Sequence, residues 1–358
     1  MRTVVAMSGG VDSTVAAALL VEAGHDVIGL SMQLYDQRAG EAVFGSCCTL
    51  DDLHDARRAA QQIGIPHYIV NFEAPFREHV IANFVSEYLA GRTPIPCTHC
   101  NSDVKFATLL DRAAGLGAER LATGHYVQVA FDEARRQYVL RRGRDQSKDQ
   151  AYFLFSLSQA QLAQAAFPVG DLTKEAVRDY ARAHGLLVAD KRDSYEICFV
   201  PNGDYAAFVE REAGGAIRPG VVRDTAGRVL ATHDGVHHFT IGQRKGLRLS
   251  AAVPLYVTAI DAASATVTVG PRASIEQRAC RVTGVNWISG VVPPGPVRAS
   301  VQIRHRHVPA WATVTPEAGA ARVVFADAQS AITPGQAAVF FDGDEVLGGG
   351  WIVSAAND

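Results

Sequence analysis

Cysteine is scarce in this sequence, with six residues among 358. So few thiols in so long a chain argue against a framework of structural disulfides, and at suggestive spacings they more often indicate metal binding or catalysis. Two of them, Cys97 and Cys100, form a CxxC pattern in the stretch "PIPCTHCNSDVKF". The pattern alone is compatible with a zinc site, a redox pair, iron–sulfur ligands, or a nucleophile with a chance neighbour.

Long apolar runs are missing as well. No stretch approaches the roughly 20 apolar residues that a membrane helix needs. The first residues, "MRTVVAMSGG", lack the apolar core of a signal peptide. The sequence therefore predicts a cytoplasmic protein without a membrane segment. With 358 residues, 48% of them hydrophobic, the chain is long enough for two or three domains with buried cores.

The net charge is small, −3 from 34 Lys and Arg against 37 Asp and Glu. This balance argues against general affinity for nucleic acid but permits local basic surfaces. Residues 135–148 carry six basic side chains and one acid, and residues 298–307 carry three arginines and two histidines without an acid. One such run is usually a solvated face. Two runs in different parts of the chain favour a polyanionic partner.

The first 212 residues alternate short apolar runs with longer helical patterns. Strands separated by helices of this length imply a parallel sheet with right-handed crossovers. Residues 1–212 are therefore predicted to form a doubly wound α/β domain. The expected strands are 3–7, 26–32, 67–72 and 119–125, and the expected helices are 12–24, 50–64 and 103–117.

The pattern becomes β-rich after a connector that contains glycine and proline, "REAGGAIRPG". Strand-like runs with turns predict hairpins at 220–232 and 255–270, within a small β-rich central domain at 213–274. Residues 275–358 are predicted to form a C-terminal β-barrel. Within it, "VRASVQIRH" alternates apolar and polar residues, which places Gln302 and Arg304 on the face away from the core.

The strongest local signal is "VVAMSGGVDS", residues 4–13. A buried strand ends at Ser8-Gly9-Gly10, and a helix begins near Asp12. The glycines let the backbone approach a ligand closely, and the helix start presents N–H groups and a positive dipole end to an anion. Asp12 would repel bare phosphate, so we assign it a Mg²⁺ ion beside the phosphates. The pattern is neither GxxxxGK[ST] nor GxGxxG.

This loop resembles the SGGxDS loop of the PP-loop ATP pyrophosphatases, which cleave ATP between the α and β phosphates and adenylate a substrate. Six further motifs in the same order make the resemblance more specific. Together they are similar to the tRNA-specific 2-thiouridylases (the MnmA, or TrmU, family) along essentially the whole chain. The motifs after the loop are "CNSDVKF", "ATGHY", "KDQAYFL", "EICFV", "HHFTIGQRKGL" and "TPGQAAVFF".

The resemblance implies ATP-dependent replacement of O2 of the wobble uridine of tRNA by sulfur, with release of AMP and pyrophosphate. It implies Cys100 as the nucleophile and Cys198 as the persulfide carrier, and a sulfur-relay protein or cysteine desulfurase as donor. For ATP it implies Ala6, Met7, Ser8, Gly9, Gly10, Val11, Asp12, Ser13, Met32 and Gly124. For tRNA it implies Ile95, Pro96, Cys97, His125, Lys148, Asp149, Gln150, Arg304, His305 and Gln336.

The sequence departs from the family at one segment. Many members read Asn-Pro-Asp where this chain has Ile95, Pro96 and Cys97, and the change creates the CxxC. Zinc would need two further ligands at good spacing, and the sequence does not offer them. A thioredoxin-like pair, an incidental Cys97, and a [4Fe–4S] cluster on Cys97, Cys100 and Cys198 stay open. We rank the disulfide and persulfide mechanism first and the cluster second.

The other cysteines and one histidine pair receive structural interpretations. Cys280 is expected to be a buried small hydrophobe, and the adjacent Cys47 and Cys48 to be packing or loop residues. His237 and His238 are expected to point to opposite faces of a strand, which disfavours a metal site. Two rival functions are a lysidine-forming PP-loop enzyme, which needs no cysteine, and a tRNA-binding module regulated by a nucleotide.

Overall fold

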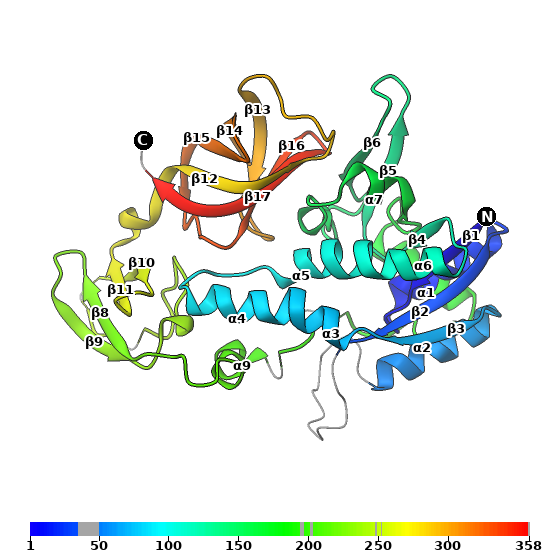
Figure 1. Cartoon of the computed structure of the whole chain (residues 1–358), viewed down its shortest axis with the longest axis horizontal. Coiled ribbons are helices and arrows are strands. Elements are labelled where there is room, and N and C mark those ends of the chain that lie inside the picture. The colour runs from blue at the N-terminus through cyan, green and yellow to red at the C-terminus, as the bar shows by residue number, and fades with distance from the viewer. Residues whose placement is uncertain (35–49, 194–196, 201–202, 248, 252, 357–358) are drawn as a thin grey trace.

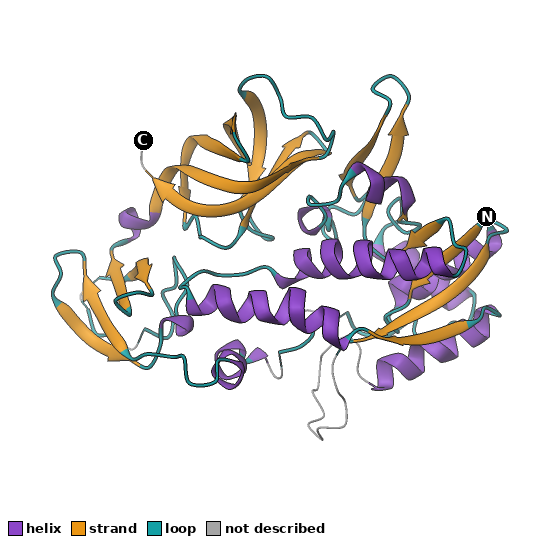
Figure 2. Ribbon diagram, in the orientation of Figure 1, coloured by secondary structure: helices purple, strands orange, loops and turns teal. Residues whose placement is uncertain are grey.

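The computed structural model describes residues 1–34, 50–193, 197–200, 203–247, 249–251 and 253–356. Cys47 and Cys48 lie outside these residues. The described residues form three β-sheets (Figure 1). Most helices lie with the first sheet, whereas the second and third sheets carry few (Figure 2).

The first sheet is parallel, in the order β3-β2-β1-β4-β7. Its central strands are short runs of apolar residues buried on both faces, as a doubly covered parallel sheet requires. The carboxyl ends of β1, β2 and β4 therefore lie along one edge. The strands are β1 (Arg2–Ala6), β2 (Asp26–Gln33), β3 (His67–Asn71), β4 (Arg120–Ala122) and β7 (Ala165–Ala166).

Helices cover both faces of this sheet, which confirms the predicted doubly wound α/β fold. Neighbouring residues of β1 show the two layers: Val5 packs in one cluster with α1 and α2, and Val4 packs in another with α4, η3 and α6. The first layer comprises α1 (Val11–Glu22), α2 (Leu50–Ile63) and α8 (Lys174–Ala183). The second comprises α3 (Glu73–Phe76), η2 (Arg77–Ile81), α4 (Ala82–Leu89), α5 (Pro96–His99), η3 (Cys100–Leu109) and α6 (Leu110–Gly115).

The second sheet, in the order β10-β11-β8-β9, has a small core around Val222, Val257 and Val267. Its two antiparallel pairs are the predicted hairpins. The strand expected for His237 and His238 is wrong, because both lie in the short 3₁₀-helix η6 (Val236–His238). The strands are β8 (Gly220–Asp224), β9 (Val229–His233), β10 (Tyr256–Asp261) and β11 (Thr266–Gly270). Helix α9 (Tyr205–Glu212) precedes this sheet, and η7 (Arg272–Ile275) follows it.

The third sheet closes into a barrel, because β12 pairs with both β15 and β17. A hairpin of β5 (Val127–Asp132) and β6 (Gln137–Arg142) joins it through one pairing, Glu345 with Arg141. The barrel strands are β12 (Glu276–Trp287), β13 (Val297–Gln302), β14 (Ala310–Glu317), β15 (Ala320–Ser330), β16 (Ala337–Asp342) and β17 (Glu345–Ala356). The short helices η4 (Ala151–Phe153) and α7 (Gln159–Gln164) follow the hairpin.

The predicted exposure of Gln302 is wrong, and its burial has a polar cause. Strand β13 ends at this residue, so the alternation stops there. The Gln302 amide donates to the backbone oxygens of Arg304 (3.2 Å) and His305 (2.7 Å) and accepts from Arg142 (3.2 Å). Arg304 lies beyond the strand, half-buried, and donates to the backbone oxygen of Ser330 (3.1 Å).

Candidate active site

The loop after β1 has a backbone that only glycine fits at one position. Gly9 has a φ of 75°, and a Cβ there would lie 2.2 Å from the backbone oxygen of Asp52. Ser13 Oγ accepts from the backbone N–H of Ser8 (3.2 Å) and donates to the Gly10 oxygen (3.2 Å), which fixes the turn into α1. The helix start and its N–H groups therefore stand at the carboxyl edge of the sheet, where ligands bind in open α/β folds.

Gly124 closes the other side of this loop. A Cβ on Gly124 would lie 2.6 Å from the Ser13 nitrogen and 2.7 Å from the Asp12 carbonyl carbon, so the end of β4 packs directly on the start of α1. Met32, at the end of β2, is also buried at this edge. The structure thus brings together the predicted ATP positions from three strand ends. Their contact with ATP stays a prediction.

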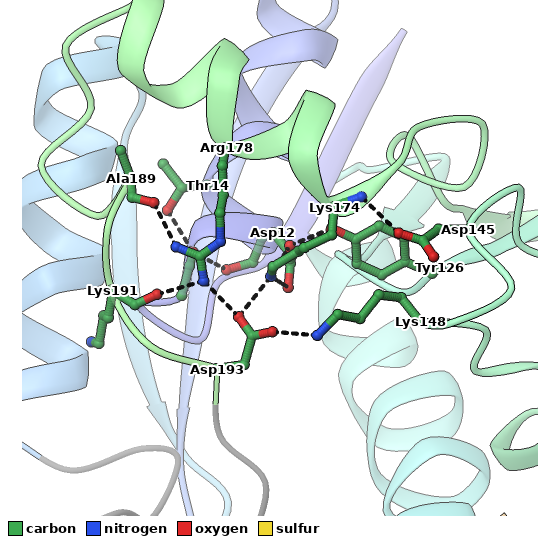
Figure 3. Close-up of polar contacts among 12 residues, drawn as sticks. Asp12, Thr14, Tyr126, Asp145, Lys148, Lys174, Arg178, Ala189, Lys191 and Asp193 are labelled. Carbon is green, nitrogen blue, oxygen red and sulfur yellow. Dashed lines mark hydrogen bonds and ion pairs between the residues drawn. The ribbon is translucent and has the colours of Figure 1, made fainter. Parts of the chain in front are cut away.

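Asp12, in the first turn of α1, is held by two donors (Figure 3). Lys174 Nζ lies 2.7 and 2.8 Å from its two carboxylate oxygens, and the Tyr126 hydroxyl donates to it at 2.7 Å. Burial and the negative charge of Asp12 raise the pKa of Tyr126 far above its ordinary value, so Tyr126 is a permanent donor. The Asp12 carboxylate is therefore held in one position beside the loop and remains partly exposed.

Asp193, near Asp12, is a second carboxylate with several basic partners (Figure 3). It accepts from Lys148 (2.7 Å), Lys174 (2.8 Å) and Arg178 (3.0 Å). Burial alone would raise the pKa of Asp193, but the hydrogen bonds from Lys148 and Lys174 outweigh it and lower the pKa to about 2. The result is a row of alternating charges that runs from Asp12 through Lys174 and Asp193 to Lys148.

Lys191 fixes the loop from the other side. Its Nζ donates to the backbone oxygen of Gly9 (3.0 Å) and to the carboxylates of Asp52 (2.7 Å) and Asp55 (2.6 Å) on α2. The same basic side chain therefore binds both the glycine turn and a helix beside it.

Cys97 and Cys100 lie at the start of a helix, one turn apart. The helix begins with Pro96 at its first position, which suits proline because that N–H has no helical partner. From Cys100 the backbone continues as the π-helix η3, a rare conformation that often marks functional sites. Cys97 is exposed and Cys100 half-buried.

Two residues that follow Cys100, Asn101 and Lys105, form a hydrogen-bonded pair near His125, a residue assigned to tRNA binding. Asn101 is buried, donates to the Phe153 oxygen (3.3 Å) and accepts from Lys105 Nζ (2.9 Å). Burial and the nearby charge of Lys105 hold the pKa of His125 well below its usual range. His125 is therefore neutral at physiological pH, with its Nδ1 hydrogen-bonded to Thr123 Oγ1 (2.7 Å).

Cys198 lies in the segment between Asp193 and helix α9. It is half-buried and packs against the large core cluster of the first domain. The next residue, Phe199, packs edge-on against Phe76 and Phe84. Cys280 is buried in the barrel, as expected, and burial raises the pKa of its thiol to about 12.

The barrel packs against the segment that leads to the cysteines. Gln336 donates to the backbone oxygen of Thr93 (2.9 Å), and the Trp351 ring stacks on His99 with centroids 4.8 Å apart. Gln336 and the stretch Ile95 to Cys97, assigned to tRNA from different ends of the chain, thus belong to one junction. Contact of this junction with tRNA stays a prediction.

Lys148, Asp149 and Gln150 follow the β5–β6 hairpin along the chain, and each has a partner within the protein. Lys148 binds Asp193, the Asp149 carboxylate binds Arg142 at 2.5 Å, and the Gln150 side chain accepts from the Tyr126 N–H at 3.0 Å. His305 is exposed and packs on Phe153 with centroids 4.6 Å apart. Arg142 and Lys148 of the first basic run are thus engaged in ion pairs within the protein.

Comparison with known proteins gives the family. Family models match residues 1–202 (tRNA methyl transferase HUP domain), 206–271 (tRNA methyl transferase PRC-barrel domain) and 277–352 (aminomethyltransferase beta-barrel domain). The tRNA-specific 2-thiouridylase MnmA of Solibacter usitatus is 53% identical over 97% of this chain and 98% of its own. The chain belongs to the tRNA-specific 2-thiouridylase family.

Other 2-thiouridylases agree with this assignment. The protein of Geotalea uraniireducens is 51% identical over 99% of this chain and 96% of its own, and that of Acidobacterium capsulatum is 52% identical over 98% of both. A 4-thiouridine synthetase in complex with RNA and ATP matches 60% of this chain and 51% of its own at 14% identity, with a TM-score of 0.35. Within the described ranges, no helix has the length and apolarity to cross a membrane.

Sequence reasoning about this 2-thiouridylase family member missed several residues around the loop and the cysteine helix. Lys174 begins α8, far along the chain from Asp12, and no spacing rule connects the two. Tyr126 follows directly after His125 in "ATGHY", so the motif itself pointed to its position. The remaining missed residues are Lys105, Asn101, Arg178, Lys191 and Asp193.

Proposed function

We propose that this chain is a tRNA-uridine 2-sulfurtransferase that uses ATP to activate O2 of the wobble uridine and then replaces this oxygen with sulfur from a cysteine persulfide. The observation that carries the proposal is the row of charges from Asp12 through Lys174 to Asp193. It connects the anion-binding loop to the segment that contains Cys198, so adenylation and sulfur transfer would take place in adjoining parts of one site.

The loop supplies what ATP requires. Backbone N–H groups at the start of α1 and the Ser8 and Ser13 hydroxyls would bind phosphate oxygens, while Gly9 and Gly124 allow close backbone approach. Attack of the uridine O2 on the α-phosphorus would form the adenylated base, and the bond to pyrophosphate would break.

The chain also fits a magnesium ion. Asp12 is a partly exposed carboxylate, an acceptor-only group, beside the position proposed for the phosphates. Mg²⁺ commonly uses one or two carboxylates and completes its shell with water and substrate phosphates. When bound it would supply charge neutralisation at the phosphates. Lys174 would then release at least one Asp12 oxygen and keep Asp193 as its partner.

Sulfur transfer needs two thiols with different tasks. We assign the persulfide to Cys198, which would receive its outer sulfur from a sulfur-relay protein or a cysteine desulfurase. That sulfur would attack C2 of the adenylated uridine, and AMP would leave with the former O2. The Cys100 thiolate would attack the inner sulfur of Cys198, so the persulfide bond breaks and a Cys100–Cys198 disulfide forms. An external thiol must then reduce this disulfide.

The barrel side of the site is proposed to hold tRNA. Arg304 and His305 follow barrel strand β13, where His305 packs on Phe153, and Gln336 binds Thr93 in the segment before the cysteine helix. The wobble base would have to enter this junction as an unstacked nucleotide, as enzymes that act on bases require.

The proposal is tested with purified protein, ATP, unmodified tRNA and a persulfide donor, with AMP and pyrophosphate as the readouts. We expect both products in equal amounts and only when tRNA is present. Binding of tRNA without either product would favour the regulated binding module. Full product release by a Cys198→Ser variant, together with a modified base that contains no sulfur, would favour a lysidine-type reaction.

A further inference from the structure

Three side chains far from the nucleotide loop converge on one point. Glu210 comes from α9, and His237 and His238 come from η6. Glu210 Oε1 lies 3.2 Å from His237 Nε2 and 3.3 Å from His238 Nε2. Among the residues that the structure describes, this is the group of three His, Cys, Asp or Glu side chains with donor atoms close enough to share a metal ion.

The separations between the donor atoms match those of a metal site. Zinc bonds to histidine nitrogen and carboxylate oxygen at about 2.0 to 2.1 Å, so two ligand atoms at the corners of a tetrahedron are about 3.3 Å apart. The two separations from Glu210 Oε1 equal this length within 0.1 Å. Two histidines and one carboxylate are also a ligand set that zinc uses, with water in the fourth position.

The backbone prepares His237 for this role. Its side chain is 1% exposed, and its ring lies against Gly235, where a Cβ would be 2.5 Å from Nδ1. The ring therefore presents Nε2, and not Nδ1, to Glu210.

We propose that Glu210, His237 and His238 form a binding site for a divalent transition-metal ion, with zinc as the best fit. The solvent-exposed sides of Glu210 and His238 leave room for a water ligand and for entry of the ion. The site lies at the contact of α9 with η6, so a bound ion would connect η6 to a helix whose Phe208 and Val209 pack in the large core cluster of the first sheet.

Helix α9 also packs against the residue next to Cys198, the proposed persulfide cysteine. Phe208, two residues before Glu210 on α9, packs against Phe199 with ring centroids 5.2 Å apart, and Phe199 directly follows Cys198. Fixing α9 therefore restricts the segment that carries Cys198. Metal binding itself needs neither tRNA, ATP nor a sulfur donor, so it is measured independently of thiolation.

The test uses the full chain, stripped of metal with a chelator and with its accessible thiols alkylated so that cysteine cannot bind the probe. Titration with Co²⁺ should give one equivalent of visible absorption typical of a tetrahedral site, which Zn²⁺ then displaces. Glu210→Gln and His238→Ala should each weaken binding by about tenfold or more. The matched control is His184→Ala, because His184 and Glu22 form an exposed pair at 3.1 Å that no second histidine joins among the described residues, and its binding should equal wild type.

A second readout keeps the result independent of spectroscopy. Zn²⁺ should raise the thermal unfolding midpoint of the wild-type chain by several degrees and leave that of Glu210→Gln unchanged. Glu210 is half-exposed, so this variant is expected to fold. The proposal is overturned if the wild-type chain binds no stoichiometric Co²⁺ or Zn²⁺, or if Glu210→Gln and His238→Ala bind either ion as wild type does.

Discussion

The ammonium group of Lys174 lies 2.7 Å and 2.8 Å from the two carboxylate oxygens of Asp12, across 162 residues of sequence. The pair joins the loop after β1 to the first residue of α8. It places a positive charge at the position where we propose that the phosphates of ATP bind, and its second partner, Asp193, lies in the segment before Cys198.

Replacing Asp12 by asparagine should separate adenylation from tRNA binding. The variant keeps the shape of the side chain but loses the charge proposed to hold Mg²⁺, so AMP release should fall about a hundredfold or more. tRNA affinity, measured by filter binding, should stay within twofold of wild type. Equal losses of AMP release and tRNA affinity would contradict the assignment.

Replacing Lys174 by methionine should lower both the free energy of unfolding and the rate of AMP release. Its side chain is only 11% exposed, and its removal leaves Asp12 and Asp193 without their shared cation. We expect a loss of about 2 kcal/mol in urea unfolding, less than for a fully buried pair because Asp12 is 31% exposed. The control is Arg182→Met on the same helix, which is exposed and should change stability by about 0.5 kcal/mol or less. Matching losses in both variants would refute a special role for Lys174.

Asp193 should contribute to stability only where it is ionised in the folded chain. Its folded pKa is about 2, below the ordinary value near 3.9, so its contribution is present above about pH 5 and is lost as the pH falls toward 2. The difference in unfolding free energy between wild type and Asp193→Asn should therefore shrink between pH 5 and pH 2. Urea unfolding at pH 7, 4 and 3 measures it, and a constant difference would show that the contribution does not come from the charge.

The cysteines should differ in their effects. Cys198→Ser should keep tRNA-dependent pyrophosphate release but give neither AMP nor thiolated tRNA, because attack by the Cys198 sulfur expels AMP. Cys97→Ser should keep all three products if Cys97 is a bystander. Purification without oxygen, followed by measurement of iron, labile sulfide and absorption near 400 nm, distinguishes the two mechanisms. A colourless, iron-free protein that thiolates tRNA dismisses the cluster. Iron that is lost in Cys97→Ser together with activity would support it.

Arg304→Ala should weaken tRNA binding without changing ATP affinity. One phosphate contact fewer should reduce the slope of log affinity against log salt by about one. The control is Arg272→Ala, an exposed arginine of η7 that pairs with Glu276, for which we expect an unchanged slope. An unchanged slope for Arg304→Ala as well would remove Arg304 from the tRNA surface.

Local patterns predicted the parallel sheet, the glycine loop and both hairpins, because apolar runs, glycine turns and strand alternation act over a few residues. The failures have physical reasons. Gln302 is buried because its amide satisfies backbone groups at a strand end, which alternation cannot foresee. The sequence around His237 and His238 resembles a strand, but both residues lie in η6, where both side chains contact Glu210.

Site residues that lie in family motifs could be predicted from the sequence. Residues that join the site only through partners far along the chain could not. "SGGVDS" and "ATGHY" placed Asp12 and Gly124, which the fold brings together. Lys174 and Asp193 follow no motif used in the prediction, because an ion pair between distant segments leaves no local trace. Such pairs are visible only after folding.

The most direct test of the proposed activity is mass spectrometry of wobble nucleosides from tRNA incubated with the purified chain, ATP and a persulfide donor. The account predicts a uridine in which one oxygen at position 2 is replaced by sulfur, formed only with ATP and absent with Cys198→Ser. A wobble uridine that remains unmodified while AMP accumulates, or sulfur incorporation without ATP, would contradict it.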